Sequence, residues 1–261
     1  MDYSQILSQQ FNIKEEYAKN IITLLDDGNT IPFIARYRKE MHGSMDDQLI
    51  REFAEKLEYL RGLDKRRDEI RSLIDAQEKL TDEINLALDK AATLSELEDI
   101  YRPYRPKRKT RASIAKEKGL EPLANDILKQ EKGFDPSKSA VDYIDEEKGV
   151  TSVEDAIQGA MDIIAELVSD NAEIRKRIRN LTNANGVLVS VATDEEKDSV
   201  YKNYYDYKEP VKKIAGHRVL AVNRGEKEGF LKVSVETDSE KPLNSIFRAM
   251  ITDKNQLCSD I

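Results

Sequence analysis

Six cationic side chains stand within residues 102–111, and their type and spacing suit the binding of phosphate groups. No carboxylate interrupts this segment, which contains Arg102, Arg105, Lys107, Arg108, Lys109 and Arg111. Cations this close repel one another, so the segment gains stability when it meets an anion. Arginine and lysine bind nucleic acids by neutralising phosphates and releasing counterions. We call residues 102–111 the basic strip and predict that its six cations contact RNA or DNA.

Two prolines and two tyrosines lie among these cations. Pro103 and Pro106 disfavour a helix and predict an extended strip. Exposed aromatic rings stack on unpaired bases, so Tyr104 is predicted to stack on one. An alternative stays open, in which neighbouring acidic helices receive the strip as an internal clamp and Tyr101 and Tyr104 anchor that clamp in the core.

A second group of cations, Arg36, Arg38 and Lys39, follows a short helix predicted to begin at residues 30–33. We expect Phe33, Ile34 and Tyr37 of this helix to face inward. The helix follows another, predicted from Lys14 to a stop at Gly28, and together they favour a helix-turn-helix-like unit. The three cations are candidate nucleic-acid contacts. The alternative is that they pair with carboxylates on the next helix.

The elements that must position these groups are mainly helical. Apolar residues at spacings of three and four predict one long helix over residues 45–79, with a weak point at Gly62. Thr81 and Ser95 are predicted N-terminal caps, the latter in a capping box with Glu98. Further helices are predicted over 113–118, 121–130, 137–147, 151–168, 171–182, 217–224 and 242–251, and strands over 187–192 and 230–235. This pattern predicts a mainly α fold with a small α/β portion and three parts, 1–80, 81–185 and 186–261.

Composition excludes several classes of protein. The chain has 42 Lys and Arg against 50 Asp and Glu, a net charge of −8, so a nucleic-acid site must be local. Apolar runs are too short for a membrane helix, and the N-terminus lacks a secretory signal. A single cysteine, Cys258, also fits a cytoplasmic location.

The sequence gives little indication of a catalytic site or a metal-binding site. His42 and His217 lie far from each other and from Cys258, without the spacing of a zinc site. We expect His42 in an exposed loop and His217 in a packing or capping position. The segment Gly225–Gly229 lacks the Lys and Ser/Thr of a phosphate loop and is interpreted as a turn. We therefore predict no enzyme activity, cofactor, metal or small-molecule substrate.

Three segments carry a family resemblance, namely Thr30–Glu40, Leu97–Arg111 and Gly216–Glu226. Together they resemble the N-terminal region of Tex, a family of bacterial transcription accessory proteins. The resemblance implies nucleic-acid binding, a role in transcription, and further domains after this region. These are an RNase-H-like YqgF domain, a helix-hairpin-helix region and an OB-fold RNA-binding domain, and the resemblance therefore predicts a truncated chain.

Two functions from different classes remain open at this point. In the first, the chain binds nucleic acid through the basic strip. In the second, it is a helical scaffold that positions other domains or contacts RNA polymerase. The sequence does not distinguish RNA from DNA.

Overall fold

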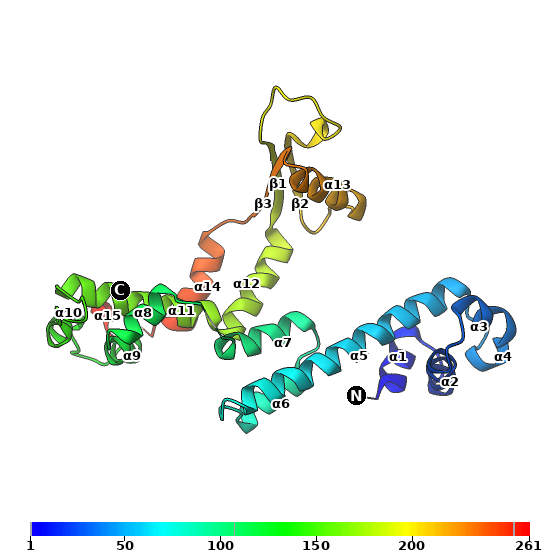
Figure 1. Ribbon diagram of the computed structural model, residues 1–261, viewed down its shortest axis with the longest axis horizontal. Coiled ribbons are helices and arrows are strands. Elements are labelled where there is room, and N and C mark those ends of the chain that lie inside the picture. The colour runs from blue at the N-terminus through cyan, green and yellow to red at the C-terminus, as the bar shows by residue number, and fades with distance from the viewer. Residues whose placement is uncertain (1, 107, 253) are drawn as a thin grey trace. The chain divides into compact units, whose positions relative to one another are not determined.

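The computed structural model describes residues 2–106, 108–252 and 254–261, which are mainly α-helical with a small antiparallel sheet (Figure 1). The predicted fold class is confirmed. The chain divides into two compact units, one up to Tyr104 and one from Arg105 to Ile261. The finer division into 1–80, 81–185 and 186–261 stays a prediction. None of the described helices is long and apolar enough to cross a bilayer.

The first unit is built around one long helix. Its elements are α1 (Tyr3–Phe11), α2 (Glu15–Asp26), α3 (Ile31–Tyr37), α4 (Lys39–His42), α5 (Asp47–Asp75), α6 (Asp82–Lys90), α7 (Leu94–Tyr101) and the 3-10 turn η1 (Arg102–Tyr104). The helix α5 has 29 residues and spans roughly 44 Å. It begins where the Asp46 carboxylate accepts a hydrogen bond from the Leu49 amide at 2.8 Å. It passes through Gly62 unbroken, so the predicted long helix is confirmed.

Two cores lie along α5 because its apolar residues recur every three or four positions. Phe53 and Leu57 pack with buried residues of α1, α2 and α3. Further along the helix, Leu63 and Ile70 pack with Leu88 of α6 and with α7. Burying one such side chain contributes about 1.5–3 kcal/mol. The long helix thus joins the two cores within the first unit.

The two predicted caps beside this second core had different outcomes. Thr81 caps α6 as predicted, accepting a hydrogen bond from the Ile84 amide at 3.3 Å. The prediction for Ser95 is wrong, because α7 begins earlier and Thr93 accepts from the Glu96 amide at 3.2 Å. Thr93 precedes an acid by three positions, as Ser95 does, so both fit the capping pattern. The packing of α7 against the second core determines where this helix begins, and therefore which of the two residues is its cap.

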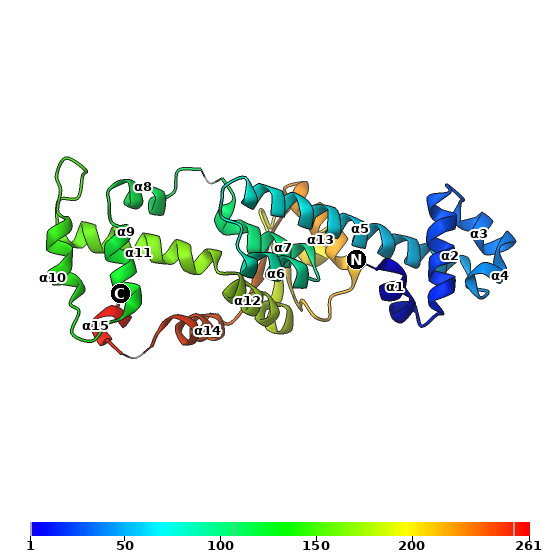
Figure 2. The same ribbon diagram turned by 90° about the horizontal axis from the view of Figure 1, so that it is seen from below.

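The helical part of the second unit surrounds α11. It consists of α8 (Arg111–Glu117), α9 (Glu121–Lys129), α10 (Pro136–Ala140), the 3-10 turn η2 (Val141–Tyr143), α11 (Val153–Asp170), α12 (Ala172–Asn185) and, near the end of the chain, α14 (Glu240–Met250) and α15 (Gln256–Ser259). Figure 2 shows α8, α9 and α10 along α11, where Leu120, Leu123 and Ile163 are almost fully buried. The helix predicted over 137–147 is wrong in extent, since helical structure ends at Tyr143 and Asp145 bridges to Val150.

A three-stranded antiparallel sheet completes the second unit. Its strands are β1 (Val187–Ala192), β2 (Asp206–Pro210) and β3 (Leu231–Glu236), in the order β2-β1-β3, with the 3-10 turn η3 (Lys202–Tyr204) and helix α13 (Gly216–Lys227) beside them. The helices α12 and α14 pack together where the chain enters and leaves this sheet (Figure 1). Strand β2 is missing from the sequence prediction. It is a short edge strand whose alternate residues are exposed, with a proline at its end.

Candidate nucleic-acid interface

The basic strip begins in the first unit as a continuation of α7. Arg102, Pro103 and Tyr104 form the turn η1, so the predicted extended conformation is wrong here. Proline fits the first turn of a helix, because the missing amide hydrogen is not needed there. The Gln77 side chain, in the turn that follows α5, donates to the Tyr104 carbonyl at 2.9 Å and holds the turn η1 against that segment.

The two tyrosines of this segment are packed rather than free. Tyr101 is 6% exposed within the second core, which confirms the core-anchor alternative for this residue. The Arg66 guanidinium lies 5.6 Å from the centre of its ring. Tyr104 is half-buried against the same core. Only part of the Tyr104 ring is therefore open to a base.

Arg105, Pro106 and Arg108, from the middle of the strip, lie in the second unit and outside any helix or strand. Arg105 and Arg108 are exposed there, and in the described part of the chain neither has an acidic partner. Lys107, the third cation predicted here, lies outside the described residues. Two guanidinium groups that have no acidic partner among the described residues favour a local positive potential in a chain of net charge −8.

The end of the strip approaches two acids of its own unit, at long distances. Lys109 lies 3.5 Å from Glu117, and both side chains are about two-thirds exposed. Arg111 lies 3.7 Å from Asp162 and is 86% exposed. The exposed pair of Lys109 and Glu117 contributes about 0–1 kcal/mol and is screened by salt. Asp162 is only 18% exposed, but the long distance and the solvent around the Arg111 guanidinium keep this second pair weak as well. Both cations can therefore turn to a phosphate at little cost.

Thr110 fixes the backbone of the strip beside these cations. Its hydroxyl donates to the Glu166 carboxylate of α11 at 3.0 Å and accepts from the Ser113 amide at 3.0 Å. The Ser113 hydroxyl in turn accepts from the Thr110 amide at 2.8 Å, which completes a capping box at the start of α8. The strip thus ends on a rigid support while the flanking cations stay in solvent.

The second predicted cluster lies where α3 meets α4. Arg36 and Lys39 are exposed, and the half-buried Arg38 places its guanidinium 5.3 Å from the centre of the Phe33 ring. In the described part of the first unit, none of these three cations forms an ion pair. The predicted inward orientation of Tyr37 is wrong, because this side chain is 63% exposed. The helix ends at Tyr37 and the chain turns at Arg38, which directs the last side chain outward.

The histidines behave differently from the prediction. His42 is fully buried, contrary to the expected exposed loop, and its Nε2 lies 3.1 Å from the Ile34 carbonyl oxygen. His217 is exposed, and Ala215 occupies the cap position of α13.

Burial raises the pKa of the Cys258 thiol, which lowers its nucleophilicity. Among the described residues, no three metal-binding side chains lie together.

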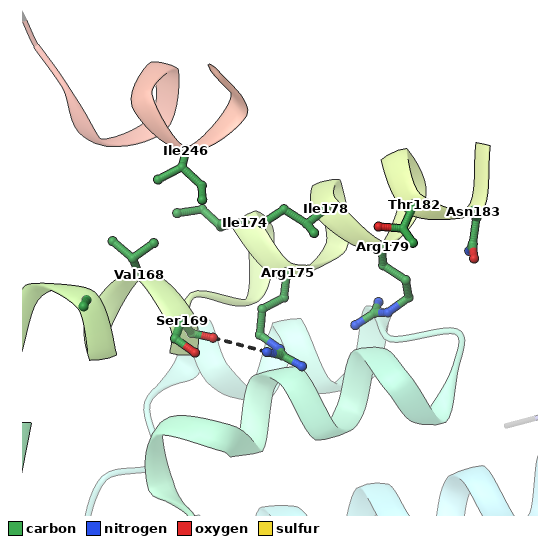
Figure 3. Close-up of a pocket in the computed structure, with 10 residues that line it drawn as sticks. Val168, Ser169, Ile174, Arg175, Ile178, Arg179, Thr182, Asn183 and Ile246 are labelled. Atoms are coloured by element: carbon green, nitrogen blue, oxygen red, sulfur yellow. Dashed lines mark hydrogen bonds between the residues drawn. The ribbon is translucent and has the colours of Figure 1, made fainter. Parts of the chain in front are cut away.

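A groove that the sequence prediction missed lies between α11, α12 and α14. The groove has a volume of about 530 Å³. Figure 3 shows that two of its lining residues, Arg175 and Arg179, extend from the same side of α12. Isoleucines from α12 and α14 contribute to its apolar lining, and Arg175 donates to the Ser169 carbonyl at 3.3 Å. The sequence feature that could have indicated this groove is the spacing of Arg175 and Arg179, which lie four positions apart and therefore on one face of a helix.

Comparison with known proteins places the chain in a family. The family model described as Tex-like protein N-terminal domain matches residues 1–75, and the one described as Tex central region-like matches residues 131–260. The chain is 45% identical over 247 residues to YdcI of Bacillus subtilis. It is 39% identical over 238 residues to transcriptional accessory protein Tex of Neisseria gonorrhoeae, and 31% over 245 residues to human S1 RNA-binding domain-containing protein 1.

These alignments cover most of this chain but a minor part of its relatives. They include 92%, 90% and 90% of the chain, against 34%, 31% and 24% of the three proteins respectively. The chain therefore spans about a third of the bacterial relatives and a quarter of the human one. Because two models of one family match it in order, and the relatives align across nearly all of it, the chain belongs to the Tex-like protein family and corresponds to its N-terminal and central regions.

Proposed function

We propose that this chain is part of a transcription accessory protein and binds nucleic acid through the basic strip. Within the second unit the contacts come from Arg105, Arg108, Lys109 and Arg111. The proposal is carried by the exposure of Arg105 and Arg108 and by their lack of an acidic partner in the described residues. The names of the Neisseria and human relatives, a transcriptional accessory protein and an S1 RNA-binding domain-containing protein, support the proposal.

The expected binding is electrostatic and therefore depends on salt. Each phosphate neutralised contributes about −0.7 to the slope of log affinity against log salt for single strands, and about −0.9 for duplexes. Four contacts predict a slope of roughly −3. No recognition of base sequence follows from these contacts, since phosphates are the same along every strand. We infer that this part of the molecule acts in the cytoplasm, and we assign no catalytic role to the residues that the structure describes.

A titration with paired variants tests the proposal. The full chain is titrated with labelled single-stranded RNA and duplex DNA of equal length, at salt concentrations of about 50 and 200 mM. We expect the double variant Arg105→Glu/Arg108→Glu to bind more weakly and to flatten the slope by about 1.4–1.8. Its matched control is Arg177→Glu/Arg248→Glu, which makes the same change of charge at exposed sites of the same unit.

The outcomes separate clearly. Retained affinity in the control, with a loss in the strip variant, supports the proposal. Undetectable binding at low salt, binding that ignores salt, or equal losses in both double variants would overturn it.

A helical scaffold is the second candidate, favoured by the attachment of the strip to α11. The hydrogen bond from Thr110 to Glu166 at 3.0 Å holds the end of the strip, and Arg111 lies near Asp162. Such a clamp would position further domains or present a face to RNA polymerase. In that case Arg111→Glu, which reverses the charge that faces Asp162, lowers the melting temperature and leaves nucleic-acid affinity unchanged. The nucleic-acid proposal expects the reverse.

A further inference from the structure

An exposed aromatic ring stands among the cations at the end of α3. The Tyr37 side chain is 63% exposed, although tyrosine normally buries most of its ring. The ring centre of Phe33 lies 5.3 Å away at an interplanar angle of 41°, and the Arg38 guanidinium covers Phe33 at 5.3 Å. Phe33 and Arg38 thus pack against one another beside Tyr37.

The backbone beneath this ring is held from several sides. The Ile34 carbonyl accepts from the Arg38 amide at 3.1 Å and lies 3.1 Å from Nε2 of the buried His42. The Asn20 side chain donates to the Met41 carbonyl at 3.0 Å, which ties α4 to α2. These hydrogen bonds hold the backbone of the turn from α3 to α4 in place, so stacking of the Tyr37 ring on a base requires little further ordering of the backbone.

Gly43 closes the same support. Its φ is +65°, and a Cβ atom there would lie 2.6 Å from the Tyr17 ring of α2. Only glycine fits both the left-handed backbone and this close approach. The end of α4 is thereby packed directly on α2, which fixes the position of the turn that carries Tyr37.

The charges around the ring are mostly positive. Arg36 and Lys39 are exposed on either side of Tyr37 in sequence, and in the described residues neither has an acidic partner. Glu40 is the one carboxylate among residues 31–42. An open ring flanked by free cations suits a base with its neighbouring phosphates, because every base offers a π-face and every linkage a negative charge.

We propose that Tyr37 stacks on one unpaired base of a single-stranded nucleic acid, while Arg36 and Lys39 bind the flanking phosphates. This contact deepens the proposed function by adding a single-strand site in the first unit. It stands on residues that the basic strip does not include. A duplex fits poorly, since its bases are stacked on one another and closed to the ring.

The absence of tryptophan from the chain provides a direct test. The variant Tyr37→Trp carries a single tryptophan, whose fluorescence reports stacking at that position. We expect quenching when single-stranded oligonucleotide is added to the full-length variant, and little quenching with a duplex of equal length. Inorganic polyphosphate, a polyanion without bases, should bind without quenching.

A matched variant controls for non-specific effects. Tyr59 is also exposed, on α5 of the same unit, but the Lys56 ammonium lies over its ring at 5.0 Å, and Glu52 and Glu55 line the same groove. Tyr59→Trp should therefore show no quenching by the same oligonucleotide. In the natural background, Tyr37→Ala should lower single-strand affinity by roughly 5- to 150-fold, whereas Tyr37→Phe, which keeps the ring, should retain it.

The outcomes distinguish this inference from the basic strip. If the Tyr37→Trp variant is quenched while Arg105→Glu/Arg108→Glu leaves affinity unchanged, the strip is excluded and the stacking site stands. If the oligonucleotide saturates the Tyr37→Trp variant without quenching its fluorescence, or polyphosphate quenches it equally, the stacking site is wrong, and the strip then stands only if Arg105→Glu/Arg108→Glu loses affinity. If no oligonucleotide binds the chain, both the stacking site and the basic strip are overturned. Quenching of the Tyr37→Trp variant by an added protein would then make this surface a protein interface.

Discussion

Arg67 of α5 donates through Nε to the main-chain carbonyl oxygen of Leu88, at 2.8 Å. Its Nη2 donates to the Ala91 carbonyl at 3.0 Å, and its Nη1 contacts Asp64. The Arg67 side chain is only 6% exposed. A buried charge persists only when its donors are satisfied, and here they are satisfied by the end of α6. The connection between α6 and α7, which precedes the basic strip, is thus fastened to the long helix.

Arg67→Met should loosen this connection, because the Ala91 carbonyl would lose its side-chain donor and the Leu88 carbonyl would keep only the Ala91 amide. We expect a loss of about 2–5 kcal/mol in the opening free energy of α6. Amide hydrogen exchange in α6 and α7 measures this locally. Arg51→Met, at an exposed position of the same helix, should change it by less than about 0.5 kcal/mol. Equal exchange rates in both variants would contradict the assignment.

Two helical glycines should respond to alanine in opposite directions. At Gly159 of α11, a Cβ atom would lie 2.3 Å from Leu120 Cδ1 and 3.3 Å from Ala115 Cβ. Gly159→Ala should therefore destabilise the second unit by about 1–3 kcal/mol through overpacking, less the gain in helix propensity. Gly62 of α5 has no neighbour within 4 Å, so Gly62→Ala should stabilise the first unit by about 0.5–1 kcal/mol. Urea unfolding with a probe in each unit measures both, and a shared sign would refute the packing argument.

Thr110 should matter for the stability of α8. Thr110→Ala removes the cap of α8 and the hydrogen bond to Glu166, and we expect a loss of about 1–2 kcal/mol, seen as faster amide exchange in α8. Thr110→Ser keeps a hydroxyl at the same position and should behave like the natural chain. If Thr110→Ala leaves α8 protected as before, the strip is not anchored there.

Acid should weaken the contact between β2 and α13. The pKa of Glu209 is lowered by the hydrogen bond from the Tyr207 hydroxyl and then by the Arg218 guanidinium, which donates at 2.8 Å. A carboxylate with a lowered folded-state pKa contributes stability above its unfolded pKa, and that contribution is lost as the pH falls through the folded value. The ordinary pKa here is 4.5, so the loss occurs below that pH.

Melting curves of the natural chain and Glu209→Gln measure this effect. We expect the natural chain to melt at higher temperature at neutral pH, and the difference to shrink as the pH falls below about 4.5. The matched control is Glu236→Gln, an exposed position on β3 outside the hydrogen bonds of Glu209, with no expected change at neutral pH. A difference that grows in acid would show that the sign is wrong.

Local chemistry determined much of the secondary structure. The long helix α5, the cap at Thr81 and strand β1 follow from spacing and capping within a few residues, and all three agree with the prediction. The same kind of local rule predicts an extended chain at Pro103, but Tyr101 packs into the core and the residues after it form a 3-10 turn. Local preference decides an element when no stronger tertiary contact opposes it.

Which side chains are exposed to solvent and which are buried was determined only by the tertiary structure. Tyr37 and His42 lie five residues apart, and the sequence prediction assigned each to the wrong environment. The turn at Arg38 sends Tyr37 into solvent and brings His42 to the Ile34 carbonyl within the core. The sequence alone determined that cations gather in the basic strip. Which of them stay unpaired depends on where the acids of distant helices lie, because an ion pair requires proximity in space.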